Sequence, residues 1–176
     1  MIKPLLAALV LLAVIPQAGP PPAQRPEPPT GAIALVVHLS NPVNNLSISD
    51  LRRIFMMETQ NWPHGRKITV VLGEKGQPGR AEVIRRICGI SEAEYDRHIL
   101  LQTFRGAIGL GPRTIRDTAA MLRFIFNAPG SIGYAPSDQV NNNSTKVLRI
   151  EGLAPSDLRY PLRLRGAGAS RPPPVE

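Results

Sequence analysis

Hydrophobic residues occur in two kinds of pattern along the middle of this chain. Uninterrupted runs of β-branched and aliphatic residues occupy positions 32–39 (AIALVVHL) and 67–72 (KITVVL). Such runs are typical of strands buried on both faces of a parallel or mixed sheet. Shorter runs at 131–135 (SIGYA) and 146–150 (KVLRI) predict two further strands.

Helical spacing of apolar residues occurs in four other segments, at 49–56, 78–89, 91–104 and 117–127. Ser49 is expected to open the first helix, and Ser91 with Glu94 has the capping-box form at the start of the third. In the second helix, Pro78 suits the first turn and Gly89 suits the C-cap. These end signals agree with the periodicity, so four helices are predicted.

The third of these segments also predicts an apolar face. Tyr95, Ile99, Leu100 and Phe104 are spaced to lie on one side of a helix. The residues that follow, 106–114 (GAIGLGPRT), are expected to form a glycine-rich loop. The element order β, α, β, α, α, α, β, β predicts an α/β fold, one mixed sheet flanked by helices.

The two ends of the chain differ from this middle part. Residues 1–18 have Lys3, an apolar run and small residues near its end, which indicates a secretory signal peptide; an uncleaved anchor is the alternative. Residues 19–31 are a proline-rich linker, and residues 161–176 form a tail expected to be disordered. One domain, 32–160, remains, and the signal predicts a periplasmic or secreted protein.

Composition narrows the function without naming it. The net charge of +8 favours anionic partners, although several arginines lie in the linker and the tail. Only 5% of the residues are aromatic, and no basic and aromatic residues interleave, so nucleic-acid binding is not expected. A membrane contact is expected only through a partner or an uncleaved signal.

The sequence contains few candidates for catalytic or metal-binding residues. The three histidines have no zinc-site spacing, so no metal and no cofactor are predicted. The lone Cys88 excludes an intrachain disulfide and is expected to be a small buried hydrophobe. We therefore predict a protein without catalysis; the alternative, an envelope enzyme, would have to use His98 or Cys88.

The segment from Gly73 to Arg80 joins an apolar run to a predicted helix and is rich in glycine. Free N–H groups and the positive dipole end of a helix attract anions at such a place. Lys75 and Arg80 would add charge, whereas Pro78 removes one donor. Glycines between a strand and a helix also occur for geometric reasons alone, so the loop is either an anion site or a turn.

Several separated motifs occur in an order that resembles a known family. They are Asn41-Pro42, the Leu-Ser-x-x-x-Leu-x-x-Ile-Phe pattern at 46–55, Asn61-Trp62, and residues 130–134 (GSIGY). Over residues 31–136 this arrangement resembles the second lobe of the phosphate ABC-transporter substrate-binding proteins. The resemblance implies the fold of one lobe of a two-lobed protein that closes on an oxyanion.

The resemblance also places a candidate oxyanion site in the 73–80 loop, at Glu74, Gly76, Gln77, Gly79 and Arg80. Glu74, Gly76 and Arg80 match the family pattern Arg-Glu-x-Gly-Ser-Gly-Thr-Arg. The first Arg and the two hydroxyl residues that serve the phosphate are replaced, by Gly73, Gln77 and Gly79, and a Pro stands between the last two. Each lost hydrogen bond to a charged group removes roughly 1.5 to 3 kcal/mol.

Two functions follow from the resemblance. The first is an exported binding module without catalysis, which binds phosphate or another oxyanion or docks on an envelope transport or sensor protein. The alternative is an oxyanion carrier whose site is completed by dimerisation or by a partner lobe.

Overall fold

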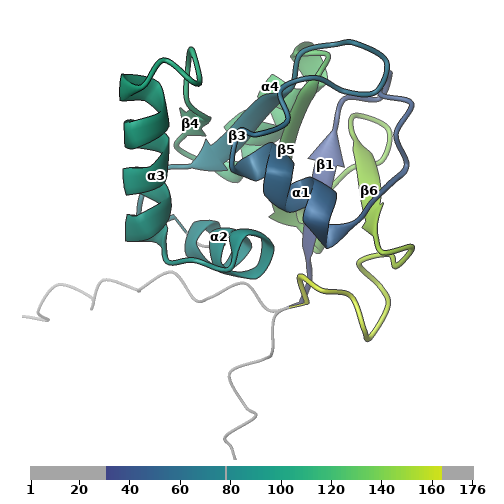
Figure 1. Ribbon diagram of the computed structural model, residues 1–176. Helices are drawn as coiled ribbons and strands as arrows, with labels where there is room; N and C mark the ends of the chain where they lie inside the picture. Colours follow the sequence, from purple (N-terminus) through teal and green to yellow (C-terminus); the bar gives the residue numbers. More distant parts are fainter. Residues whose placement is uncertain (1–30, 78, 164–176) are drawn as a thin grey trace, which may run out of the picture.

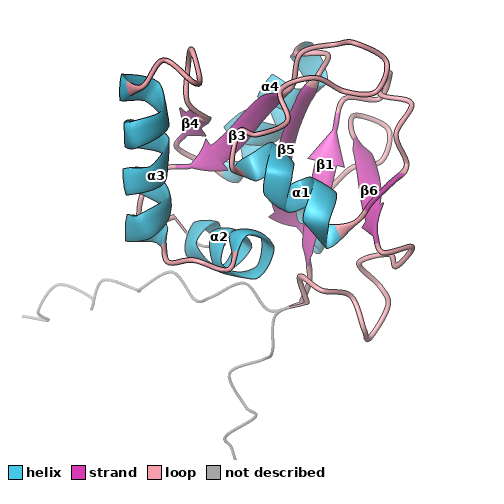
Figure 2. Cartoon of the chain, in the orientation of Figure 1, coloured by secondary structure: helices cyan, strands magenta, loops and turns pink. Residues whose placement is uncertain are grey.

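A computed structural model describes residues 31–77 and 79–163. They form one mixed sheet with helices around it (Figures 1 and 2). In chain order the elements are β1 (Ile33–Val37), β2 (Asn45–Leu46), α1 (Ile48–Phe55), β3 (Thr69–Gly73), α2 (Arg80–Cys88), α3 (Glu92–Phe104), β4 (Arg113–Ile115), α4 (Thr118–Asn127), β5 (Ser131–Pro136), the 3₁₀ turn η1 (Ser137–Gln139) and β6 (Lys146–Ile150). The prediction of an α/β fold with a mixed sheet is confirmed.

The sheet has the strand order β2-β6-β1-β5-β3-β4. β1 pairs antiparallel with both β5 and β6, whereas β2 with β6, β3 with β5 and β3 with β4 are parallel. β1 therefore runs against the other five strands. The carboxyl ends of β3 and β4 consequently lie at the same edge of the sheet, and the 73–80 loop begins there.

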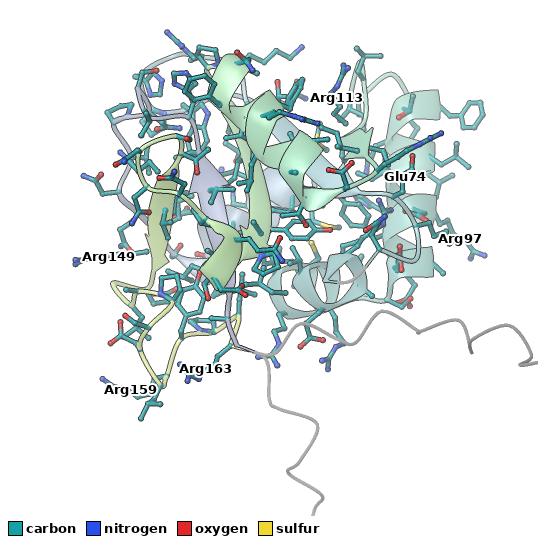
Figure 3. All side chains as sticks on the ribbon, turned by 180° about the vertical axis from the view of Figure 1, so that it is seen from behind. Glu74, Arg97, Arg113, Arg149, Arg159 and Arg163 are labelled. Atoms are coloured by element: carbon teal, nitrogen blue, oxygen red, sulfur yellow. The ribbon has the colours of Figure 1, made fainter. Side chains whose placement is uncertain are left out.

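Helices cover both faces of the sheet, which explains why its central strands are continuously apolar. α1 and α2 lie on one face, and α4 lies on the other, as the front and back views show (Figures 1 and 3). A Cβ on Gly133 of β5 would lie 2.8 Å from Ile125 of α4. Because Gly133 has no side chain, α4 packs directly against the sheet.

The helix starts follow the capping rules, with one correction. Ser47, not Ser49, is the N-cap of α1. Its hydroxyl accepts from the Asp50 N–H, and the Asp50 carboxylate accepts from the Ser47 N–H, which completes a capping box. Ser49 is inside the helix because Ser47 offers the acceptor two residues earlier. At α3 the predicted Ser91–Glu94 capping box is confirmed.

The bounds of α2 are narrower than the sequence predicts. The helix begins at Arg80, two residues after the predicted start, and the expected Gly89 C-cap is confirmed in the left-handed conformation (φ +74°). The sequence pattern also missed β2 and β4. β4 falls in the predicted glycine-rich loop, because three residues at a sheet edge have too little periodicity to show a strand.

The predicted apolar face of α3 is only partly buried. Tyr95 is inside the core, but the exposed fraction is 56% for Leu100 and 80% for Phe104. α3 lies beside the β4 edge instead of over a face of the sheet (Figure 1). Its second half therefore has no layer of described residues to cover it.

The packed chain continues to Arg163. Leu162 is fully buried, and the N–H of Ile33 donates to its carbonyl at 3.0 Å, so packing extends past Tyr160, where the sequence placed the end of the domain. The predicted signal peptide, most of the linker and the tail from residue 164 lie outside the described residues. No helix in 31–77 or 79–163 is long and apolar enough to cross a membrane.

Two of the separated sequence motifs meet at Gly130. Its carbonyl accepts from the indole N–H of Trp62 at 2.9 Å and from the N–H of Thr69 at 3.1 Å. Gly130 has φ +99°, and a Cβ there would lie 2.5 Å from the Lys67 carbonyl oxygen. The turn before β5 is thereby fixed to the turn before β3.

Gly130→Ala is expected to lower the free energy of unfolding by about 2–4 kcal/mol. A left-handed backbone costs alanine ~1–2 kcal/mol, and the steric overlap of its Cβ with the Lys67 carbonyl oxygen accounts for the rest. Gly65→Ala is the control, because Gly65 has φ +85° but nothing within 4 Å of a Cβ. Urea denaturation of both variants measures the difference. Equal losses would show that contact with Lys67 has no role.

Candidate binding loop at the start of helix α2

Backbone hydrogen bonds, one of them to β4, hold the described part of the 73–80 loop. The Glu74 N–H donates to the Ile115 carbonyl of β4 at 3.0 Å, and the Gln77 N–H donates to the Glu74 carbonyl at 2.9 Å. Gly76 and Gly79 have φ +83° and +88°, which an L-residue rarely adopts. The backbone conformation therefore explains why glycine occurs at these two positions of the loop.

The N-terminus of α2, the positive end of the helix dipole, has no side-chain cap among the described residues. Gly79 is the N-cap and has no side chain, and no side chain of the described residues forms a capping hydrogen bond there. The Arg80 N–H donates to the Gln77 carbonyl at 3.3 Å, but the next N–H groups have no partner within the helix and carry partial positive charge. This is the part of the loop that retains a capacity to attract an anion.

The Arg80 side chain points into the protein and is occupied there. Only 8% of it is exposed, and its Nε donates to Glu92 Oε1 at 2.6 Å. Its Nη2 donates to Asp96 Oδ1 at 2.5 Å, and its Nη1 donates to the Gly73 carbonyl at 2.9 Å. All three nitrogens are therefore used in joining β3, α2 and α3.

The outer surface of the loop has exposed but paired charges. Lys75 Nζ lies 3.5 Å from Asp96 Oδ2, and Arg116 Nε lies 3.4 Å from Glu74 Oε1. With Arg80 and Glu92, these residues make three cations and three carboxylates. The local formal charge is zero, so the loop does not present the excess positive charge that the whole chain has.

Tyr134 of β5 closes the space behind the loop. Its hydroxyl oxygen accepts from the Gly73 N–H at 3.1 Å. Burial raises the pKa of the Tyr134 hydroxyl to about 12, so it stays neutral at physiological pH. A Cβ on Gly73 would lie 2.9 Å from that oxygen and 3.0 Å from Gln77 Cβ. The position at which the resembled family has its first Arg thus has no room for a side chain.

The five predicted site residues occupy one loop, but they do not converge. Glu74 and Gly76 are exposed, Gln77 and Gly79 are half-buried, and Arg80 faces inward. The prediction missed three residues that decide the local chemistry: Glu92, Asp96 and Tyr134. The spacing of Glu92 and Asp96, four apart on one helix face, was the available signal for a shared cation.

Among the described residues, no hydrogen bond or ion pair joins His98 or Cys88, the residues of the enzyme alternative, to a carboxylate. His98 Nε2 lies 3.3 Å from the Met56 carbonyl oxygen. Cys88 is fully buried, and this burial raises the pKa of its thiol to about 12. Within the described ranges, no group of three His, Cys, Asp or Glu residues is placed to hold a metal ion.

The Cys88 thiol is expected to react with a thiol reagent such as DTNB at least ~100-fold more slowly in the native protein than in urea, because a buried thiol is neither accessible nor ionised. The absorbance of the released thiolate measures both rates. Equal rates would contradict the buried position of Cys88.

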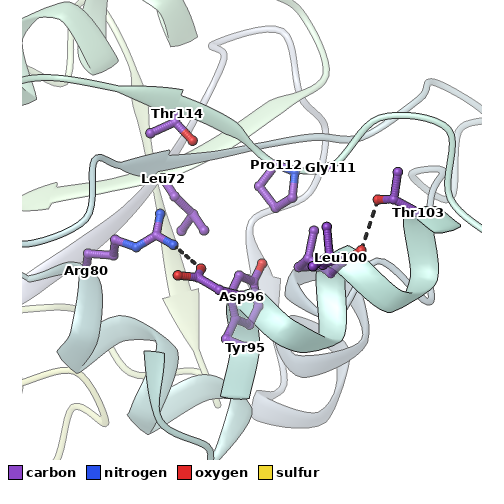
Figure 4. Close-up of a pocket in the computed structure, with 10 residues that line it drawn as sticks. Leu72, Arg80, Tyr95, Asp96, Leu100, Thr103, Gly111, Pro112 and Thr114 are labelled. Atoms are coloured by element: carbon purple, nitrogen blue, oxygen red, sulfur yellow. Dashed lines mark hydrogen bonds and ion pairs between the residues drawn. The ribbon is translucent and has the colours of Figure 1, made fainter. Parts of the chain in front are cut away.

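A pocket of about 250 Å³ opens beside the loop, between α3 and β4 (Figure 4). Its walls are mainly apolar, with Leu72 of β3, Leu100 of α3 and Pro112 before β4. Arg80 and Asp96, which are paired with each other, also line it. A second hollow of about 490 Å³ lies on the other side of the segment that contains Gly111 and Pro112.

The fold is similar to solved structures of phosphate-binding proteins. A protein assigned as a phosphate ABC-transporter substrate-binding protein, with bound phosphate, from Clostridium perfringens shares 20% sequence identity, with a TM-score of 0.58 over 70% of this chain and 46% of its own. An ABC-type phosphate transport receptor from Vibrio cholerae shares 20%, with a TM-score of 0.57 over 71% and 48%. PstS from Borrelia burgdorferi shares 15%, with a TM-score of 0.55 over 71% and 49%.

The chain spans under half the length of each of these structures, which is the size of one lobe. No protein-family model and no curated protein matches the sequence. The structural similarity that the sequence motifs implied is confirmed at the level of the fold.

Proposed function

We propose that the protein is an exported binding module without catalysis, which docks on a second protein body in the cell envelope. The contact region is the sheet edge that carries the 73–80 loop. A transport or sensor protein is the expected class of partner. The observation that carries the proposal is the fold of about half a phosphate-binding protein, combined with a loop whose cationic residue is already paired.

Docking fits this loop better than tight phosphate binding does. Arg80 gives its donors to Glu92, Asp96 and the Gly73 carbonyl. Phosphate could take them only by displacing Glu92 and Asp96 from a buried arginine, and this would leave the largely buried Glu92 without its ion-pair partner. The described part of the turn, in contrast, exposes Glu74, Lys75 and Gly76, which suits a protein contact.

Photo-crosslinking in the native host tests the proposal. A benzophenone amino acid in place of Lys75, whose side chain is 73% exposed, is expected to form one protein adduct, identified by mass spectrometry. Asn142 is the control position, because it is exposed and lies in the turn before β6 instead of beside the loop. No adduct at position 75, or the same adducts at both positions, would overturn the proposal.

Oxyanion binding is the second candidate, and the uncapped start of α2 favours it. Lys75 and Arg116 lie near the loop and are largely exposed, with 73% and 86% of their side chains accessible. Either can turn from its carboxylate to an anion, since exposed ion pairs contribute only ~0–1 kcal/mol. A dimer or a partner lobe would then supply the other half of the site, and titration with phosphate separates the two candidates.

A further inference from the structure

We propose that the outer side of α3 binds an acidic amphipathic helix of the partner protein, which inserts one large apolar side chain into the pocket between α3 and β4. The surface, called here the α3 patch, consists of Leu100, Leu101 and Phe104. This inference rests on the proposed docking function. It adds which surface binds the partner and what kind of side chains the partner presents there.

The α3 patch is apolar and uncovered by any described residue. The exposed fractions of Leu100, Leu101 and Phe104 are 56%, 46% and 80%. α3 is held to the core through Tyr95 near its start. Its second half thus continues the helical stripe that the sequence predicts, without a protein layer beneath it. A contiguous exposed apolar surface of this kind marks an interaction site.

The pocket gives the α3 patch a place for an anchor residue. Leu100 belongs to both the patch and the pocket wall, together with Ile99 and Thr103 from the same side of α3. A cavity of ~150 Å³ is enough to hold a benzene ring. The pocket of about 250 Å³ therefore has room for one aromatic or branched side chain. Anchors of this type dominate binding energy in protein interfaces.

Two arginines flank the α3 patch. Arg97 and Arg105 are exposed on α3 and just after it. Among the described residues, no carboxylate lies within ion-pair distance of either, and Asp96 at the pocket is paired with Arg80 and Lys75. Arg97 extends outward in Figure 3. A partner helix with Glu or Asp beside its apolar face would complement them.

The same charges disfavour a second copy of this chain as the occupant. A two-fold contact brings each patch against its own copy. Arg97 and Arg105 of both copies would then lie in one interface without carboxylates paired to them, and like charges across an interface cost several kcal/mol. Complementarity therefore favours a different, acidic protein.

Photo-crosslinking from Leu101 in the native host tests the inference, with the crosslinked peptide mapped in the partner. The expected adduct is a helix that has apolar residues at i, i+3 and i+4 spacing and acidic neighbours. Leu158 is the control position, because it is 84% exposed and lies near the end of the described chain. Adducts at position 75 without any at 101 would overturn this inference and leave the docking function standing; silence at both positions would overturn both.

A peptide assay gives the second measurement. Two labelled helical peptides share Leu and Phe anchors, and their flanking residues are Glu in one and Lys in the other. The Glu peptide is expected to bind at least ~10-fold more tightly than the Lys peptide, and Phe104→Ser is expected to weaken it by at least ~10-fold. Leu158→Ser should leave binding unchanged. Equal binding of the two peptides, no binding of the Glu peptide, or a concentration-dependent dimer that Phe104→Ser dissolves, would contradict the proposal.

Discussion

Arg80→Ala is expected to lower the free energy of unfolding by about 3–5 kcal/mol, because removing one partner of a buried ion pair leaves uncompensated charge. Glu92 and the Gly73 carbonyl lose the Arg80 donor in this variant, and Asp96 keeps only Lys75. Urea denaturation followed by circular dichroism measures the loss. If the truncated protein does not fold, Arg80→Lys, which keeps the charge but not the fork of donors, is expected to fold with reduced stability.

Arg85→Ala is the matched control for Arg80. Arg85 is on the same helix and pairs with Glu82 at 2.5 Å, but 65% of its side chain is exposed. An exposed pair contributes under ~1 kcal/mol. If Arg80→Ala cost no more than Arg85→Ala, Arg80 would not be a structural residue, and its guanidinium would be available to an anion.

Tyr95→Ala is expected to destabilise the protein by about 3–5 kcal/mol, as truncation of a buried aromatic residue does. Tyr95 is the buried residue of α3, and its hydroxyl donates to the Phe55 carbonyl at 2.7 Å. Because Tyr95 holds α3 against the core, amide exchange along α3 should accelerate more than exchange in β1. Denaturation and hydrogen exchange together check this expectation.

Tyr95→Phe isolates the hydroxyl from the ring. It removes one hydrogen bond and leaves the Phe55 carbonyl without that donor, at a cost of about 1–2 kcal/mol. Equal losses for the two substitutions would mean that the ring contributes little packing and that α3 is held elsewhere.

The sequence predicts those parts of the fold that depend on neighbours in the chain. The Ser91–Glu94 capping box and the Gly89 C-cap are local, and both are confirmed. Continuous apolar runs indicate buried strands, and β1 and β3 are buried as predicted. β4 escaped detection because its three residues become a strand only by pairing with β3, about forty positions earlier in the sequence.

The candidate site was harder to predict, for the same physical reason. In the sequence, Arg80 is a cation beside a glycine-rich turn. Its partners Glu92 and Asp96 are 12 and 16 residues away, and they reach it only because α3 packs on α2. Likewise, periodicity predicts that Leu100 and Phe104 share a face, but it does not indicate what covers that face. Contacts between elements decide both the pairing of Arg80 and the exposure of this face of α3.

Calorimetric titration of the protein with phosphate is the most direct test of whether the paired Arg80 leaves the 73–80 loop without a phosphate site. We expect no binding tighter than a Kd of ~1 mM, which corresponds to about −4 kcal/mol. Lys75→Ala and Arg116→Ala should then change nothing in the titration. A saturable one-to-one Kd in the micromolar range, weakened by either substitution, would instead establish the loop as an oxyanion site.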